Sequence, residues 1–179
     1  MVGKRKTALT GTTTSMLSIL SILLSLVLFV TYCAMYIAHH ELPVSLSDTF
    51  YHVQHRWKFS VFIMVIAALV FVPWMEATER LEFLVFFACF SVFLVAASPQ
   101  FKEDFVSQIH YGAAGVMFIS TVVWEIFNGG LYWVLGGFAV LAFINRKRWV
   151  LWIEIGLFLE LHLTILIRDA EKVIVNLCS

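Results

Sequence analysis

Long apolar stretches alternate with short polar connections along the whole chain. The first stretch, residues 16–38, carries no charged side chain and exceeds the about 20 helical residues that cross the hydrocarbon core of a bilayer. A cleavable signal peptide has a shorter apolar region of about 7–15 residues, followed by small residues at the cleavage site. This stretch instead ends in Tyr32, Tyr36 and two histidines. The pattern therefore predicts an uncleaved first transmembrane helix.

Five further apolar stretches follow, and proline and glycine mark their limits. They cover residues 59–75, 81–97, 109–127, 131–145 and 149–167. Pro43, Pro73 and Pro99 lie at or near helix ends, and Asn128-Gly129-Gly130 separates the fourth helix from the fifth. The fifth is the shortest, so we expect it to tilt or to borrow residues from its flanks. All tryptophans fall within about two turns of a predicted helix end, where an indole ring favours the membrane interface.

The predicted fold is an all-α bundle of six transmembrane helices in a single domain over residues 1–179, with a basic leader at 1–15 and a short amphipathic tail at 168–179. The composition agrees, because 61% of the 179 residues are hydrophobic and 13% are charged, with a mean hydropathy of +0.90. A soluble domain is roughly 45–50% apolar and about 25% charged. The composition therefore excludes an ordinary water-soluble globule.

Charge and cysteine content narrow the classes of partner. Twelve Lys and Arg balance twelve Asp and Glu, so the chain lacks the positive footprint that nucleic-acid binding requires, and we expect no nucleic-acid partner. Cys33, Cys89 and Cys178 lie far apart, which indicates neither a disulfide framework nor a CxxC site.

The basic residues give conflicting signals about orientation. Six helices place both termini on one side of the membrane, and the twelve basic residues divide equally between the two sides. The leader Lys4-Arg5-Lys6 favours cytoplasmic termini, because the first helix usually dominates, whereas Arg146-Lys147-Arg148 in a tight turn favours the reverse. We expect cytoplasmic termini in a cell or inner membrane.

Histidines and carboxylates gather in two connections on one predicted face. The connection at 39–58 holds four of the six histidines, and its Asp48 and His52 would share one face of a helix. The connection after the third helix ends at His110, which is followed by Tyr111 and by small residues that allow close helix approach. We take His110 and Tyr111 as candidate binding residues. Imidazoles and carboxylates in one place bind a transition metal or relay protons. No HExxH pair occurs, so solvated histidines remain the alternative, and His110 could simply hydrogen-bond the loop or a lipid headgroup.

The last helix carries Glu154, Glu160 and His162 within an apolar span. An acidic side chain at bilayer depth costs roughly 2.5–3.5 kcal/mol on insertion scales, so such groups usually face protein or water. At about 100° per residue, Glu160 points nearly opposite His162. Glu160 is a candidate catalytic group. The alternative is that its carboxyl group is protonated and only hydrogen-bonds a neighbouring helix. Glu154 is a candidate binding group that could instead pair with Arg148, and Glu125, near a helix end, is expected at the interface.

Short motifs carry a family resemblance over about residues 16–145. They are LPVSLSDTFYH at 42–52, AASPQF at 96–101 and IHYGAAGVMFIS at 109–120. The chain resembles bacterial six-helix membrane proteins of unknown function related to the DRAM/Sfk family. The positions that match the family pattern are Ser45, Ser47, Asp48, Pro99, His110, Ala114 and Phe118.

A more distant similarity is to the CREST superfamily of membrane hydrolases, which includes alkaline ceramidases. Its members use a Ser, an Asp and three His around a zinc ion, so the resemblance implies Ser47 and Asp48 as catalytic candidates and His52, His110 and His162 as zinc ligands. The chain departs from that pattern, because it has six predicted helices and a lone His162 in place of a C-terminal HxxxH.

Three hypotheses for function follow. The first is a polar site directed at membrane lipids on the face of the two histidine-bearing connections, which binds or senses lipid or hydrolyses it with a metal-activated water. The second is an accessory or regulatory subunit that binds another membrane protein. The third is a small proton-coupled transporter that uses Glu160 and His162.

Overall fold

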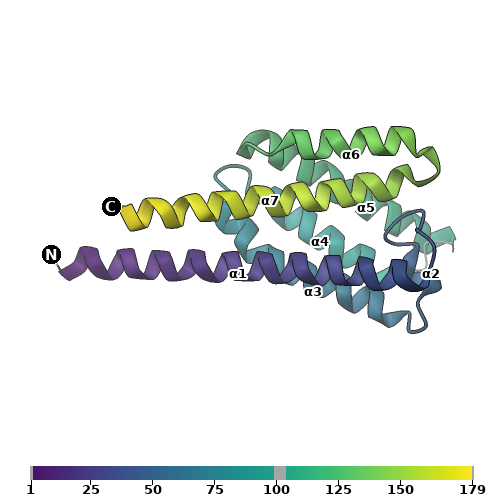
Figure 1. Cartoon of the computed structure of the whole chain (residues 1–179), viewed down its shortest axis with the longest axis horizontal. Coiled ribbons are helices and arrows are strands. Elements are labelled where there is room, and N and C mark those ends of the chain that lie inside the picture. The colour runs from purple at the N-terminus through teal and green to yellow at the C-terminus, as the bar shows by residue number, and fades with distance from the viewer. Residues whose placement is uncertain (1, 99–103, 179) are drawn as a thin grey trace.

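Helices account for the regular structure of the described chain. The computed structural model describes residues 2–98 and 104–178, so the predicted turn at Pro99 lies outside the described residues. The helices are α1 (Val2–His39), α2 (Thr49–His52), α3 (Trp57–Ala77), α4 (Phe83–Ala97), α5 (Asp104–Asn128), α6 (Tyr132–Ile144) and α7 (Trp149–Cys178), with a short 3₁₀ turn, η1 (Arg146–Arg148), before the last (Figure 1). No β-strand occurs in residues 2–98 or 104–178.

Four of these helices are long and apolar enough to cross a membrane. They are Met16–His39 within α1, Trp57–Ala77, Asp104–Asn128 and Arg146–Val175. Of the other three, α2 has 4 residues, whereas α4 with 15 residues and α6 with 13 are apolar but shorter than the four spans. At 1.5 Å per residue they extend about 20 Å, less than the ~30 Å hydrocarbon core. The chain is an all-α membrane protein in which two short helices complete the bundle.

Both terminal helices extend beyond the predicted membrane spans. α1 begins at Val2 and α7 ends at Cys178, so the expected leader and tail continue the first and last helices. The helix α1 would be about 57 Å long, and both ends extend beyond the bundle on the same side (Figure 1). The tail of α7 is tied to the bundle, because Arg168 Nη1 donates to Ala77 O (2.7 Å) and Lys172 Nζ donates to Glu76 O (2.7 Å).

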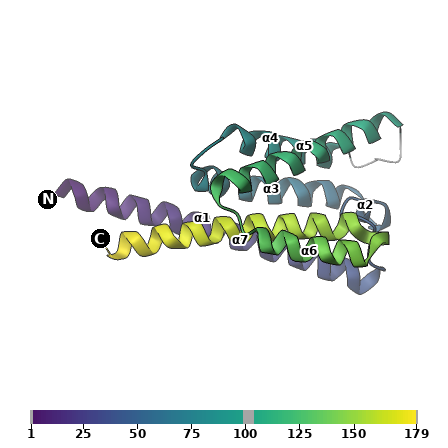
Figure 2. The ribbon, with the colours of Figure 1, turned by 90° about the horizontal axis from the view of Figure 1, so that it is seen from above.

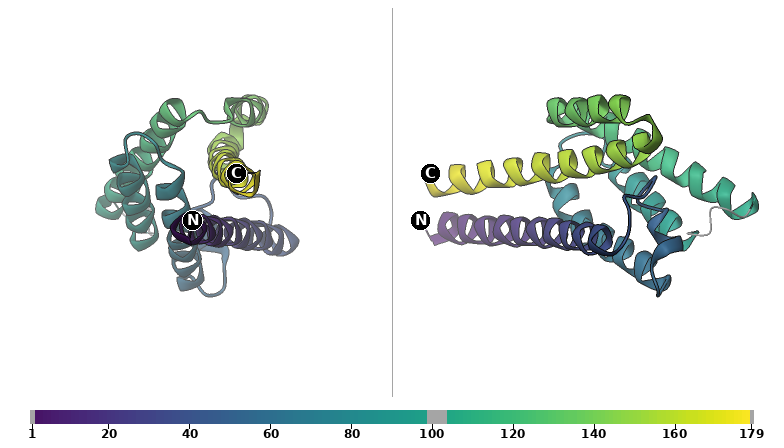
Figure 3. Two further views of the ribbon diagram at one scale, coloured as in Figure 1. Left: turned by 90° about the vertical axis from the view of Figure 1, so that its left-hand side faces the viewer. Right: turned by 45° about the vertical axis from the view of Figure 1, so that its right-hand side comes forward.

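The helices pack in an arc around a shared apolar core. α1 contacts α3 and α7, α4 lies between α3 and α5, and α6 packs against α7 (Figures 2 and 3). Trp74 of α3 and Trp124 of α5 meet edge to face with ring centroids 5.6 Å apart. The core also includes Ile22, Phe29, Ile66, Val70, Val85, Ala88, Leu161 and Ile165.

Asn128 clamps the connection between α3 and α4 to the end of α5. Its Oδ1 accepts from the amides of Glu79 (3.0 Å) and Arg80 (3.2 Å). Its Nδ2 donates to the carbonyl oxygens of Arg80 (3.1 Å) and Trp124 (3.0 Å). Beyond it, Gly129 takes a φ of +73°, a conformation in which glycine carries no Cβ penalty. The clamp therefore fixes the end of the bundle at which both termini lie.

Candidate functional site

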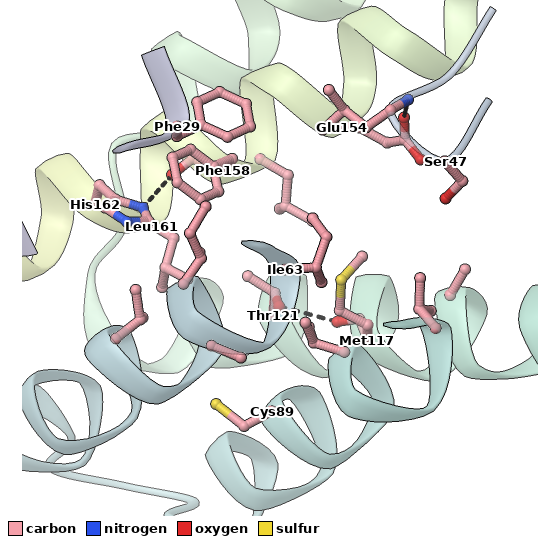
Figure 4. Close-up of a pocket in the computed structure, with 18 of the residues that line it drawn as sticks. Phe29, Ser47, Ile63, Cys89, Met117, Thr121, Glu154, Phe158, Leu161 and His162 are labelled. Atoms are coloured by element: carbon pink, nitrogen blue, oxygen red, sulfur yellow. Dashed lines mark hydrogen bonds between the residues drawn. The ribbon is translucent and has the colours of Figure 1, made fainter. Parts of the chain in front are cut away.

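A cavity of about 150 Å³ lies inside the bundle between α1, α3, α4, α5 and α7 (Figure 4). A cavity of this size can accept a benzene-sized apolar group. The lining residues are Phe29, Leu46, Ser47, Phe59, Ile63, Ile66, Ala67, Val70, Trp74, Cys89, Val92, Val95, Ala114, Met117, Thr121, Glu154, Leu157, Phe158, Leu161 and His162.

The cavity wall is apolar apart from a few groups. Thr121 donates its hydroxyl to Met117 O (2.9 Å), so that proton is used within α5. Ser47 and Glu154 lie at one end of the cavity and His162 lies away from them (Figure 4). The site therefore combines a hydrocarbon-lined interior with one polar end.

Ser47 and His110 form a buried hydrogen-bonded pair at the polar end. Ser47 Oγ is 3.1 Å from His110 Nε2, and His110 Nδ1 is 2.9 Å from Ser98 O. A carbonyl oxygen can only accept, so Nδ1 carries the proton and Nε2 of the neutral ring accepts from the Ser47 hydroxyl. Ser47 is 7% exposed and His110 is 3% exposed. The backbone directly after α4 thus orients the ring toward the serine.

The loop that carries Ser47 is fastened to the start of α7. The Leu46 amide donates to Glu154 Oε2 (2.7 Å), and the Leu151 amide donates to Val44 O (3.2 Å). Arg148 Nε donates to Leu42 O (3.0 Å). Arg148 and Glu154 each bind the loop backbone, and these contacts fix the position of Ser47.

His162 lies away from Ser47 and Glu154 and is hydrogen-bonded to a second serine. Its Nε2 is 2.9 Å from Ser25 Oγ of α1, and its Nδ1 donates to Phe158 O (2.8 Å). The ring stacks on Phe158 with centroids 3.9 Å apart, and Phe158 stacks on Phe29 at 3.8 Å. This pair joins α1 to α7 inside the bundle.

Two buried carboxyl groups lie among α5, α6 and α7. Glu160 Oε2 accepts from the Leu135 amide (3.1 Å), and Glu125 Oε2 accepts from Thr164 Oγ1 (3.2 Å). Each Oε1 is buried without a hydrogen-bond partner. Glu160 is 0% exposed, and it faces α6 while His162 faces α1, as the helical angles predict. Glu125, expected at the interface near a helix end, is buried within the protein, where it packs against Gly130 and is 2% exposed.

The other predicted site residues lie nearer the surface. His52 Nδ1 is 3.1 Å from Asp48 O and 3.9 Å from Asp48 Oδ2. The side chain of His52 is 47% exposed, and Tyr111 is 60% exposed. Asp48 and His52 thus contact each other, as their spacing predicts.

The histidines named as zinc candidates do not gather. His110, His162 and His52 bond separately to Ser47, Ser25 and the Asp48 backbone. Within residues 2–98 and 104–178, no three His, Cys, Asp or Glu side chains form a group able to hold a metal ion. The described side chains thus offer no zinc centre.

Sequence reasoning missed several partners of these residues. It gave no role to Ser25, Ser98 or Thr164, because a serine or threonine in an apolar helix has no distinctive pattern. The partner of His110 is a carbonyl group, which every residue has. The Gly-Gly step after Asn128 was the one signal that a side chain approaches this backbone closely, as Glu125 does at Gly130.

Comparison with known proteins gives no relative. No protein-family model matches the chain, and no curated protein or solved structure matches it. The resemblance to the DRAM/Sfk family and the more distant one to the CREST superfamily stay predictions that rest on the motifs.

Proposed function

We propose that this protein binds a membrane lipid, with a segment of the hydrocarbon chain in the cavity and the polar part at the end formed by Ser47 and Glu154. The observation that carries the proposal is the cavity itself, about 150 Å³ inside a membrane bundle and lined mainly by aliphatic and aromatic side chains. Apolar pockets with a few placed polar groups are the usual form of a small-ligand site.

The polar end matches the amphiphilic character of a lipid. Glu154 accepts hydrogen bonds, and Ser47 both donates and accepts them. Both line the cavity where the loop before α2 meets α7. A headgroup or ester that lies there keeps its polar atoms hydrogen-bonded while the chain replaces empty space between α3, α5 and α7. Such filling gains dispersion contacts that an empty cavity lacks.

The proposed lipid binding involves no metal ion. The separate hydrogen bonds of His52, His110 and His162 give no support to a zinc centre. We further propose cytoplasmic termini, as the Lys4-Arg5-Lys6 leader favours.

The proposal is tested by native mass spectrometry of protein purified in mild detergent, with extraction of the retained lipid. Ala114 lines the cavity from α5, whereas Ala139 is exposed on α6. We expect wild type and Ala139→Phe to retain lipid and Ala114→Phe to lose most of it, with similar melting temperatures for the two variants.

Equal retention by all three proteins would contradict a site in the cavity. A stoichiometric membrane-protein partner with no retained lipid would also contradict the proposal, and would favour the accessory-subunit hypothesis.

A further inference from the structure

Two Ser–His pairs occur among the side chains that the structure describes, and only one of their serines faces the cavity. Ser47, paired with His110, lines the cavity, whereas Ser25, paired with His162, does not and is 0% exposed. The two pairs have the same local geometry, since in each the histidine Nδ1 donates to a backbone carbonyl oxygen and Nε2 faces the serine hydroxyl. They differ in access to a ligand.

We propose that Ser47 is a nucleophile and His110 its general base, and that the protein cleaves an ester bond of the lipid held in the cavity. This inference rests on the proposed function, because the cavity must first hold the chain of that ester. It needs no metal ion, which separates it from hydrolysis by a metal-activated water.

The geometry supplies a nucleophile, a base and a group that orients the base. A serine hydroxyl is a weak nucleophile until an adjacent base takes its proton, and the base must itself be oriented by a third group. Ser47 Oγ lies 3.1 Å from His110 Nε2, and Ser98 O, 2.9 Å from Nδ1, orients the ring. The distance from Ser47 Oγ to His110 Nε2 falls in the range for proton transfer from a nucleophile to its base.

The reaction needs only the ester and water. Ser47 Oγ forms a bond to the ester carbonyl carbon while its proton passes to His110 Nε2. The ester C–O bond to the alcohol then breaks, and the alcohol oxygen takes that proton from Nε2. A water molecule attacks the acyl group on Ser47 and gives its proton to His110, and the carboxylic acid leaves as the proton returns to Ser47 Oγ. All atoms are accounted for, and no group is oxidised or reduced.

The position of Ser47 fits the ester of a bound lipid. The ester carbonyl joins the hydrocarbon chain to the polar part of the molecule, and Ser47 lies where the apolar lining of the cavity meets Glu154. The amide of Leu46, directly before Ser47, donates to Glu154 Oε2 (2.7 Å), so the loop is fixed before a ligand binds. A nucleophile held in place before binding lowers the entropic part of the barrier.

The test is labelling of the full-length purified protein with an alkyl fluorophosphonate, followed by peptide mapping. We expect phosphonylation of Ser47 in wild type and its absence in Ser47→Ala. His110→Gln, which can hydrogen-bond but is a poor base, should slow labelling by about 10²-fold or more. Ser25→Ala is the matched control and should label at the wild-type rate. Melting temperatures establish that each variant is folded. The variant Ser47→Cys replaces the hydroxyl by a thiol, and its labelling by an alkyl iodoacetamide should still depend on His110.

The outcomes separate this inference from the binding proposal. Folded, lipid-retaining wild type without a label on Ser47 overturns the inference and leaves lipid binding intact. Labelling of Ser47 that is independent of His110 also overturns it. Labelled Ser47 in a protein whose cavity retains no lipid supports the nucleophile and contradicts the proposed function. A labelling rate unaffected by a chelator is expected, and its loss on chelation would overturn the metal-free mechanism.

Discussion

Replacement of Asn128 by alanine tests the clamp between α5 and the α3–α4 connection. The side chain is 1% exposed and makes four hydrogen bonds of 3.0–3.2 Å to backbone groups. A net contribution of about 0.5–1.5 kcal/mol per bond gives about 2–6 kcal/mol in total. Glu79 and Arg80 are exposed, so water can replace part of the lost hydrogen bonding, and we expect a loss at the lower end of this range, about 2–3 kcal/mol.

Thermal unfolding in detergent, followed by tryptophan fluorescence, measures this loss. For a chain of this size about 1 kcal/mol shifts the melting temperature by roughly 2–4 °C, so Asn128→Ala should melt roughly 4–12 °C below wild type. Asn128→Asp keeps an acceptor for the two amides but sets its second oxygen against the carbonyl oxygens of Arg80 and Trp124, so it should melt at least as far below wild type as Asn128→Ala. Asn145, which makes no capping hydrogen bond with its side chain, gives the control variant Asn145→Ala. A melting temperature of Asn128→Ala equal to that of this control would refute the clamp.

Three further predictions concern packing, the loop and the topology. Gly156→Ala adds a Cβ 2.5 Å from a side-chain atom of α6, whereas the Cβ added by Gly137→Ala meets nothing within 4 Å. Because overpacking costs about 1–3 kcal/mol, only Gly156→Ala should lower the melting temperature, and equal melting temperatures would contradict the α6–α7 packing. Glu154→Ala removes the acceptor of the Leu46 amide, which should then exchange its hydrogen about 10-fold faster or more; an unchanged rate would contradict this contact. Cys178 is free and exposed, so a membrane-impermeant maleimide should label it only after cells are permeabilised, and labelling of intact cells would place the termini outside.

The helices were predictable because their signals are local. The uncharged run at 16–38 became the spanning part of α1, and the Gly-Gly step after Asn128 ended α5 as expected. The helical structure of α1 before residue 16 and of α7 after residue 167 was not predicted, because a charged helical turn outside the bilayer has a composition similar to that of a loop. The last part of α7 is also held by the hydrogen bond from Arg168 to Ala77, a residue far away in the sequence.

The candidate site was predictable only in part. The sequence singled out Ser47, His110 and Glu154 separately, from charge and motif. Their arrangement depends on how the loop before α2 folds back onto α7, and on the carbonyl oxygen directly after α4 that meets His110. Such pairings join residues far apart in the sequence and have no periodicity, so helical spacing within one segment does not encode them. The burial of Glu125 against Gly130 was missed for the same reason.

The most direct test of a lipid chain in the cavity is photo-crosslinking with a lipid that carries a diazirine in its acyl chain. We expect saturable crosslinks to cavity-lining residues such as Met117 and Phe158, which compete with unlabelled lipid and fall sharply in Ala114→Phe. Crosslinks confined to membrane-facing side chains such as Phe143, which is 70% exposed, with no saturation and no effect of Ala114→Phe, would contradict lipid binding in the cavity.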